Sequence, residues 1–280
     1  MMQIAIVDYK NKMAAKEFTD SLHNTGFGVI SNHPIDISLI DDVYEEWRQF
    51  FQNPHRHDYL FDKTTQDGYV PPSLSETAKG YKEKDLKEFY HLYSWGRYPS
   101  MLSDKTKKLQ EQLTTLATEL LKWIEEFTPK PIAEKFSMPL SQMLENSQHI
   151  LFRILRYPPL TGNEPSDAVR AAAHGDINLI TLLPTATEPG LQVQDNAGNW
   201  HDVKCDHGMV VVNVGDMLQE CSDNWYRSTQ HRVINPTGEA AKQERLSMPL
   251  FLHPQSDVRL STRHTAESYL HERRQELGLI

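Results

Sequence analysis

The second half of this chain is a series of short β-prone segments separated by residues that favour turns. From about residue 148, one such segment follows another, and the turn formers of 196–199 separate two of them: HILFRILRY, NLITLLP, GLQVQ, NWHDVK, MVVVNVGDML, STQHRVIN and RLSMPLFLHP. Many short strands at close spacing are typical of a β-sandwich or barrel. They argue against a parallel α/β sheet, in which helices would alternate with the strands.

The first half of the chain favours helices. Apolar residues recur at three- and four-residue steps in the first half and again at the C-terminus, over 14–24, 38–51, 105–127 and 265–279. Thr265 is a suitable N-cap for the last of these helices. Two short strand-like runs, 4–7 and 26–30, lie near the N-terminus.

These patterns predict a mainly β fold with flanking α elements. We expect a single domain over 1–280, with a β core in 148–255. The helices of 1–147 and one helix within 256–280 would brace this core. With 280 residues, such a domain buries a sizeable apolar interior.

Composition limits the possible partners and compartment. The chain has 38 acidic and 29 basic residues, a formal net charge of −9, which argues against a general role in binding nucleic acid or membranes. No apolar run is long enough to cross a bilayer, and the N-terminus lacks the pattern of a secretory signal, so we expect a cytoplasmic protein. Cys205 and Cys221 match no zinc or redox spacing, and we expect two reduced thiols.

The segment His174-Gly175-Asp176 places two metal-ligand residue types two positions apart. On a strand, these side chains would point to the same face. A third ligand, His231, follows Asp176 by 55 positions within another β-prone run. Two histidines and one carboxylate form the facial triad of non-haem Fe(II) oxygenases, although zinc also binds such a set. Because the chain has 13 histidines, this spacing alone is weak, and its neighbours must support it.

A candidate anion clamp follows the triad. Arg245 and Ser247 lie 14 and 16 positions beyond His231 and would share one face of a strand. A guanidinium binds a carboxylate through two parallel hydrogen bonds, and a serine hydroxyl adds a directed donor. Together they suit the distal carboxylate of 2-oxoglutarate, to which Tyr157 could add its hydroxyl.

Strand alternation places Arg153 on the same face as Tyr157. A charge that points into the interior needs a partner, which could be a substrate carboxylate or an acid of the protein itself. Phe251 is a candidate wall residue of the substrate site, and it is equally well explained as ordinary core.

These motifs resemble the isopenicillin N synthase-like branch of the 2-oxoglutarate and Fe(II)-dependent dioxygenases. The resemblance runs in order along nearly the whole chain through Gly26-Phe27, Asn32-His33-Pro34, Phe50-Phe51, Gly68-Tyr69, Asp85–Phe89, His174–Leu183, Gly190–Val193, Val212–Leu218, Tyr226–Ser228, His231–Val233 and Arg245–Ser247. It implies a double-stranded β-helix (jelly-roll) core with the triad and the clamp inside. Two positions depart from the pattern: Gly175 stands where the family often has Thr, Ser or Glu, and Leu155 where many plant members have Asn.

The resemblance implies an oxidoreductase that uses Fe(II), 2-oxoglutarate and O2, with ascorbate as a possible accessory reductant. It would hydroxylate, desaturate or cyclise a small molecule and release succinate and CO2. Two alternatives remain open at this point. An oxidase of the isopenicillin N synthase type would need no oxoacid, and a metal-binding protein on the same fold would be catalytically silent. Neither the substrate nor the oligomeric state can be read from the sequence.

Overall fold

The computed structural model describes residues 2–75, 83–165 and 167–276. Its α-helices are α1 (Ala14–Thr25), α2 (Ile37–Gln52), α3 (Lys105–Phe127), α4 (Lys130–Ala133), α5 (Asp216–Cys221) and α6 (Ala266–Glu276). Single 3-10 turns occur at Pro54–Tyr59, Pro72–Leu74, Gln142–Leu144 and Gly238–Lys242.

The strands form two sheets. The strands in chain order are β1 (Ile6–Asp8), β2 (Phe27–Ser31), β3 (Gly68–Val70), β4 (Glu88–Leu92), β5 (Leu151–Tyr157), β6 (Ala171–His174), β7 (Ile180–Pro184), β8 (Leu191–Gln194), β9 (Trp200–Asp202), β10 (Val210–Val214), β11 (His231–Val233), β12 (Arg245–Ser247) and β13 (Leu250–Leu252). The larger sheet has the order β1-β2-β10-β7-β13-β5-β4-β3, and β12 also pairs with β5. The smaller sheet has the order β6-β11-β8-β9.

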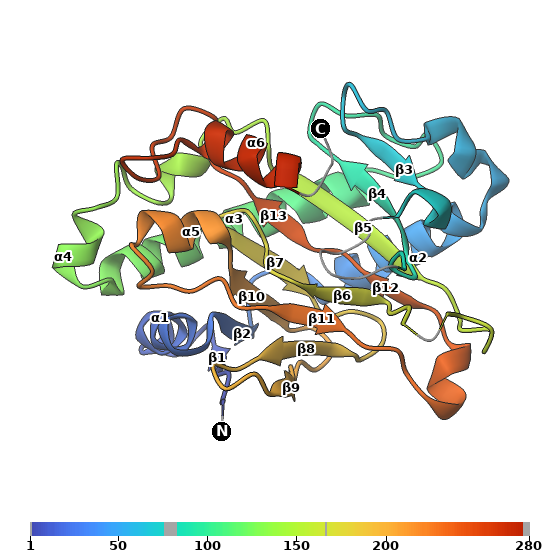
Figure 1. The fold of residues 1–280 in the computed structure, drawn as a ribbon, viewed down its shortest axis with the longest axis horizontal. Coiled ribbons are helices and arrows are strands. Elements are labelled where there is room, and N and C mark those ends of the chain that lie inside the picture. The colour runs from blue at the N-terminus through green and yellow to red at the C-terminus, as the bar shows by residue number, and fades with distance from the viewer. Residues whose placement is uncertain (1, 76–82, 166, 277–280) are drawn as a thin grey trace.

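Helices α1, α2 and α3 pack on one face of the larger sheet, and the smaller sheet lies over the other face (Figure 1). Alternation along the strands explains this arrangement. Phe152 and Ile154 of β5 join the main core with the apolar side of α3, whereas Leu155 and Tyr157 pack toward Ala171 and Val233 of the smaller sheet. The space between the two sheets is therefore lined by every second residue of β5.

Strand register places the predicted site residues side by side between the sheets. Arg245 lies opposite Tyr157, and Ser247 lies opposite Leu155. Farther along the same face, Phe251 lies opposite Thr181 of β7. The interior thus has a guanidinium at one end and, at the other, the segment that carries Asp176.

The predicted helices 14–24, 38–51 and 105–127 are confirmed to within about one residue. The helix predicted over 265–279 begins at Ala266 after a hydrogen bond from the Ser268 backbone N–H to Thr265 Oγ1, as expected of an N-cap. Residues 277–279 of that prediction lie outside the described residues.

Three details differ from the sequence-based expectation. MVVVNVGDML is a strand only as far as Val214, because Asp216 begins the short helix α5. RLSMPLFLHP forms two strands with a break at Pro249, whose ring has no N–H to donate to a ladder. His174 and Asp176 do not share one strand, since β6 ends at His174 and Asp176 lies in the bend that follows.

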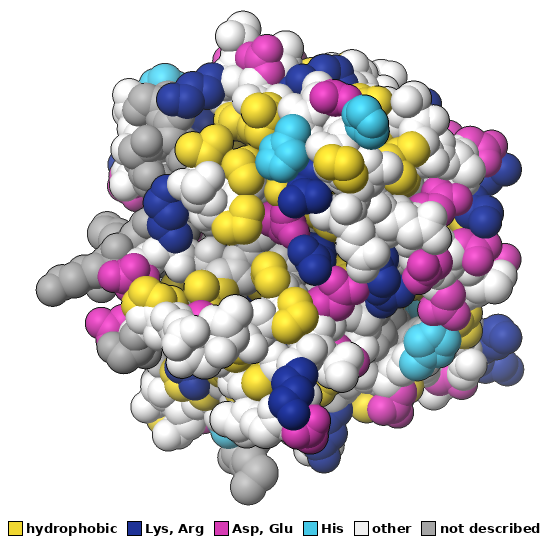
Figure 2. All heavy atoms as spheres, turned by 90° about the vertical axis from the view of Figure 1, so that its right-hand side faces the viewer, with side chains coloured by type: hydrophobic (Ala, Val, Ile, Leu, Met, Phe, Trp, Pro, Cys, Tyr) yellow, Lys and Arg dark blue, Asp and Glu magenta, His cyan; other side chains and the backbone are white. Residues whose placement is uncertain are grey.

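In the part of the chain that the structure describes, no helix combines the length and the apolar character that spanning a bilayer requires. Figure 2 shows the side of the molecule that lies at the right of Figure 1. Acidic and basic side chains are interspersed there, without an extended area of one sign.

Candidate iron and 2-oxoglutarate site

The three predicted metal ligands meet between the sheets. His231 at the start of β11 lies directly opposite His174 at the end of β6 in the antiparallel ladder. Asp176 Oδ1 lies 3.9 Å from His174 Nε2 and 3.7 Å from His231 Nε2. One ligand atom from each residue lies within 4.8 Å of the other two. Among the described residues, this is the group of His, Cys, Asp and Glu side chains with the geometry to hold one metal ion.

Backbone carbonyls orient both imidazoles. His174 Nδ1 lies 2.8 Å from the carbonyl oxygen of Ala172, and His231 Nδ1 lies 3.2 Å from that of Thr229. Since a carbonyl only accepts, each Nδ1 must carry the proton, and each Nε2 keeps its lone pair for a metal. This is the tautomer that a metal site of this kind requires.

The Asp176 carboxylate is held from behind. Its Oδ2 accepts hydrogen bonds from Thr181 Oγ1 at 2.6 Å and from Asn213 Nδ2 at 2.8 Å, which leaves Oδ1 toward the histidines. Burial raises the pKa of this carboxyl, but the two histidines and these two hydrogen bonds outweigh burial and hold the pKa below its usual value. The carboxylate is therefore ionised at neutral pH, as a ligand must be.

His174 combines a crowded environment with one open edge. Its side chain is 44% exposed, yet the surrounding protein, the neighbouring His231 and Lys87 lower its pKa to about 4. Desolvation is the main cause. A neutral imidazole beside an accessible opening is suited to a metal that must also bind small molecules.

The predicted clamp is buried behind the triad. Arg245, Ser247 and Tyr157 are 2%, 4% and 3% exposed. The Arg245 guanidinium carbon lies 5.2 Å from the centroid of the Tyr157 ring, and Arg245 Nε donates to the carbonyl of Glu188 at 2.9 Å. Arg245 Nη1 is buried and has no hydrogen-bond partner. A buried cation with an unused donor is the expected partner of an organic anion, so these residues fit 2-oxoglutarate.

Arg153 and Phe251 lie on the same interior face. The Arg153 guanidinium carbon is 4.8 Å from the centroid of Phe89 and 5.4 Å from that of Phe251, and Arg153 Nε donates to His91 Nε2 at 2.9 Å. Sandwiching between aromatic faces stabilises a guanidinium through cation–π attraction. The structure thus gives Arg153 partners within the protein, and its role toward a substrate remains a prediction.

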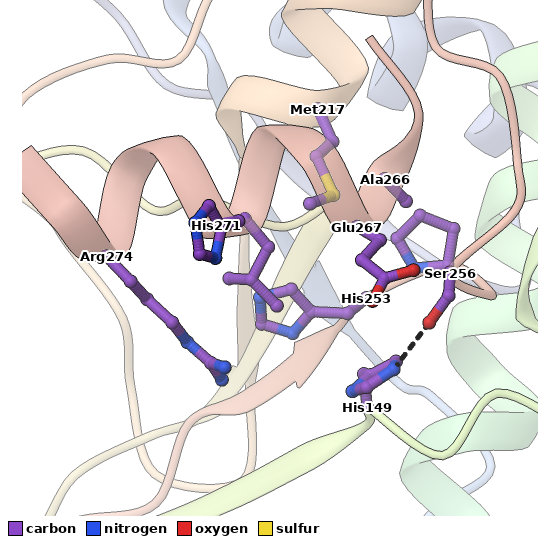
Figure 3. A pocket seen from close by; sticks show the side chains of 10 residues that line it. His149, Met217, His253, Ser256, Ala266, Glu267, His271 and Arg274 are labelled. Carbon is purple, nitrogen blue, oxygen red and sulfur yellow. Dashed lines mark hydrogen bonds between the residues drawn. The ribbon is translucent and has the colours of Figure 1, made fainter. Parts of the chain in front are cut away.

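A cavity of about 120 Å³ lies between the end of β13, the segment before β5 and helices α5 and α6. Figure 3 shows His253 and His149 on one side of it and Arg274 reaching in from the last turn of α6. His149 Nε2 lies 2.8 Å from Ser256 Oγ, whereas His253 Nδ1 is buried without a hydrogen-bond partner. Met217 of the lining follows Asp216, whose backbone N–H donates to the Asp176 carbonyl at 2.7 Å, so this cavity lies near the segment that carries Asp176.

Sequence reasoning missed the residues that support the site. Asn213 was noticed only as part of a strand, although its place in the buried run VVVNV is unusual for an amide and could have marked it. His253 gives no signal in the sequence, because no second candidate ligand stands at a useful spacing from it. Thr181 gave no signal, since threonine is common in strands.

The missing side chain of Gly175 is explained by crowding. A Cβ at this position would lie 2.9 Å from Ser228 Oγ and 3.1 Å from Gln230 Nε2. The side chains of Ser228 and Gln230, in the segment before β11, thus occupy the space that the larger residue of the family pattern would need at position 175.

Comparison with known proteins agrees with this geometry. The model of the 2OG-Fe(II) oxygenase superfamily matches residues 146–254, and that of the N-terminal region of non-haem dioxygenases in morphine synthesis matches residues 4–114. An oxygenase-family protein from Shewanella oneidensis superposes with a TM-score of 0.90 and is 50% identical, with 100% of both chains covered. The chain belongs to the 2OG-Fe(II) oxygenase superfamily.

More distant proteins share the fold. A 2OG-Fe(II) oxygenase family protein from Caulobacter crescentus has a TM-score of 0.81 and 28% identity, covering 99% of this chain and 100% of its own. A Neurospora crassa protein, solved in complex with alpha-KG, has a TM-score of 0.78 and 21% identity over 97% of this chain and 95% of its own. Jasmonate-induced oxygenase 4 of Arabidopsis thaliana is 29% identical over 83% of this chain. The chain spans only 66% of that relative's length.

Membership in the superfamily confirms three predictions from the sequence. The fold is the jelly-roll expected of this family, the chain is an oxidoreductase, and its cofactors are Fe(II) and 2-oxoglutarate. The rival zinc assignment for the triad is thereby disfavoured.

Proposed function

We propose that this chain is a dioxygenase that couples the oxidation of a small molecule to the oxidative decarboxylation of 2-oxoglutarate. One O2 would be consumed, with one oxygen atom entering succinate as CO2 leaves. The other oxygen would enter the substrate as a hydroxyl group, or would leave as water if the substrate is desaturated or cyclised. The observation that carries the proposal is the triad within 4.8 Å, beside a buried guanidinium that has an unused donor.

In this proposal, His174, Asp176 and His231 hold the metal. Bound Fe(II) would supply the activation of O2. Thr181 and Asn213 keep Asp176 aimed at the histidines, and the Ala172 and Thr229 carbonyls keep both Nε2 atoms deprotonated. Arg245, Ser247 and Tyr157 would bind the distal carboxylate of 2-oxoglutarate and so orient its other end toward the triad.

The substrate would bind in the cavity between the end of β13 and helix α6, near the segment that carries Asp176. The lining of the cavity there contains Arg274 and three histidines, His149, His253 and His271, against one carboxylate, Glu267. Burial lowers the pKa of His149 and of His253, so these rings are neutral near pH 7 and act as hydrogen-bonding groups. The lining therefore favours a small molecule with a hydrogen-bond-accepting group. Structural neighbours bind small molecules too, since the Neurospora crassa protein has also been solved with alpha-KG and thymine.

The test is the stoichiometry of turnover. Metal-free protein would be reloaded anaerobically with Fe(II), and O2 uptake and succinate would be measured with and without 2-oxoglutarate across a panel of small organic acids and their neutral esters. We expect one succinate per O2 and loss of both signals in Asp176→Ala. Oxygen uptake that needs a panel compound but no 2-oxoglutarate would instead establish an oxidase. Iron binding with no oxygen uptake under any condition would contradict catalysis.

A further inference from the structure

Arg170, immediately before β6, is a buried cation without an acidic partner. It is 1% exposed, and its Nη2 donates to the carbonyl of Gln243 at 2.9 Å. Its Nε is buried and makes no hydrogen bond. Within the described ranges, no carboxylate lies at salt-bridge distance from this guanidinium. Burial of a charge in this manner is costly unless something else compensates it.

A second uncompensated guanidinium lies on the same aromatic ring. The guanidinium carbons of Arg170 and Arg245 are 6.0 Å and 5.2 Å from the centroid of Tyr157. Burial, and next the charge of Arg245, lower the pKa of Arg170, while Tyr157 and Glu188 act in the opposite direction. Glu188 gives Arg245 its backbone carbonyl rather than its carboxylate. The interior around Tyr157 thus gathers two positive charges that the described protein does not neutralise with an ion pair.

One carboxylate could satisfy both side chains. It offers two oxygens with about four acceptor sites, enough for two guanidiniums and a hydroxyl. Arg170 and Arg245 each keep one buried donor unused, Nε and Nη1 respectively. An anion near the Tyr157 ring would offset the repulsion between the two cations and would accept a hydrogen bond from each unused donor. Neither backbone carbonyl contact does this, because carbonyls carry no net charge.

We propose that Arg170 is a second guanidinium of the co-substrate site, which shares the distal carboxylate of 2-oxoglutarate with Arg245. This inference rests on the proposed function and goes beyond the Arg245–Ser247 clamp read from the sequence. Arg170 would make the site selective for dicarboxylic 2-oxoacids. A 2-oxoacid without the distal carboxylate would leave both cations unneutralised.

The experiment compares two ligands that share the metal-binding end. 2-Oxoglutarate has the distal carboxylate, and 2-oxobutyrate lacks it. Their dissociation constants would be measured by anaerobic calorimetry on protein loaded with Mn(II) in place of Fe(II), so that no turnover is needed. The variants are Arg170→Met and the charge-preserving Arg170→Lys. Arg232→Met is the matched control, because Arg232 is a half-buried arginine whose partner is the Gln192 side chain and which stacks on Trp200.

We expect Arg170→Met to weaken 2-oxoglutarate binding about tenfold or more, a loss of about 1.4 kcal/mol, with 2-oxobutyrate unaffected. Arg170→Lys should fall between this variant and the wild type, and Arg232→Met should match the wild type. The proposal would be overturned if Arg170→Met weakened the binding of both 2-oxoacids equally, or of neither. Arg170 would then only support the Gln243 segment. If Arg170→Met does not fold, the same comparison applies to Arg170→Lys. Failure of the wild type itself to bind 2-oxoglutarate would instead refute the proposed function.

Discussion

Thr181 donates its hydroxyl hydrogen to Oδ2 of Asp176 at 2.6 Å, and this contact ties β7 to the segment after β6 that carries this proposed metal ligand. Both residues are almost fully buried, at 2% and 6% exposure. Because Asn213 occupies the same oxygen from β10, two strands of the larger sheet fix the one carboxylate of the triad. The precision of the proposed metal site thus depends on the larger sheet, although both histidines belong to the smaller one.

Removing the Thr181 hydroxyl should therefore weaken metal binding without unfolding the protein. Thr181→Val keeps the side-chain shape but removes one of the two hydrogen bonds to Oδ2 and leaves that of Asn213. Loss of a hydrogen bond that orients a ligand lowers metal affinity by roughly 10–100-fold. Competition with a metal-sensitive dye would measure the dissociation constant for Mn(II). The control is Thr114→Val, which removes a hydroxyl that only donates within α3. Equal affinities in the two variants would contradict the role given to Thr181.

The clamp predicts a graded loss of 2-oxoglutarate affinity. Arg245→Met removes a buried charge-assisted contact of about 2–3 kcal/mol, and the KM for 2-oxoglutarate should rise on the order of 30-fold or more. Ser247→Ala removes the one hydrogen bond that its uncharged hydroxyl would donate, worth about 1 kcal/mol, and should raise KM roughly fivefold. Initial rates of succinate formation at varied 2-oxoglutarate would measure both effects. A larger rise in KM for Ser247→Ala than for Arg245→Met would contradict the proposal that the guanidinium contributes more to binding than the hydroxyl.

Sequence periodicity predicted the long helices well, because α3 repeats its apolar residues over 23 residues and needs no tertiary information. The candidate ligands His174, Asp176 and His231 were predicted from motif spacing, and the structure brings them together. The shared-strand argument that linked His174 to Asp176 was nevertheless wrong, since β6 ends at His174. The correct juxtaposition comes from the pairing of β6 with β11, and such long-range register is not encoded in any local pattern.

Supporting residues were harder to predict for the same reason. Arg170 stands in the run VRAAAH, where it is indistinguishable from a surface arginine. Only the packing of this run against β5 and the Gln243 segment buries it next to Tyr157. When the partners of a buried polar residue lie far away in sequence, its role can be recognised only in the folded structure, from a donor that has no partner.

The absence of a side chain at residue 175 can be tested with a pair of substitutions. Gly175→Ala places a Cβ 2.9 Å from Ser228 Oγ and should cost about 1 kcal/mol of unfolding free energy through local overpacking. Ser228→Ala removes the closest atom, so the double variant should recover most of that loss. Urea unfolding of the four proteins would give the coupling energy. If the changes in unfolding free energy of the two substitutions were strictly additive, Ser228 would not be the residue that disfavours a side chain at position 175.

His253 should make the fold sensitive to acid. Burial, and next the charge of His149, lower its pKa to about 4, whereas an exposed histidine titrates near 6.5. Below pH 6.5 the unfolded state takes up a proton that folded His253 resists, so stability present above this pH is lost as the pH falls toward 4. His253→Asn should reduce the decrease in unfolding free energy between pH 7 and pH 4.5 by on the order of 1–3 kcal/mol. An unchanged pH profile in urea titrations would contradict this assignment.

Filling the cavity between the end of β13 and α6 should separate substrate oxidation from 2-oxoglutarate turnover. Leu270 lines this cavity of about 120 Å³ from α6, and Leu270→Trp would place an indole ring in it without changing a residue of the triad or the clamp. Once a substrate is known, its oxidation should fall at least tenfold in this variant, whereas slow succinate formation without substrate should persist. Gln275→Trp places the same ring on the exposed side of α6 and should behave as the wild type. Retention of full substrate oxidation in Leu270→Trp would mean that the substrate reaches the metal by another route, past Arg153 and Phe251.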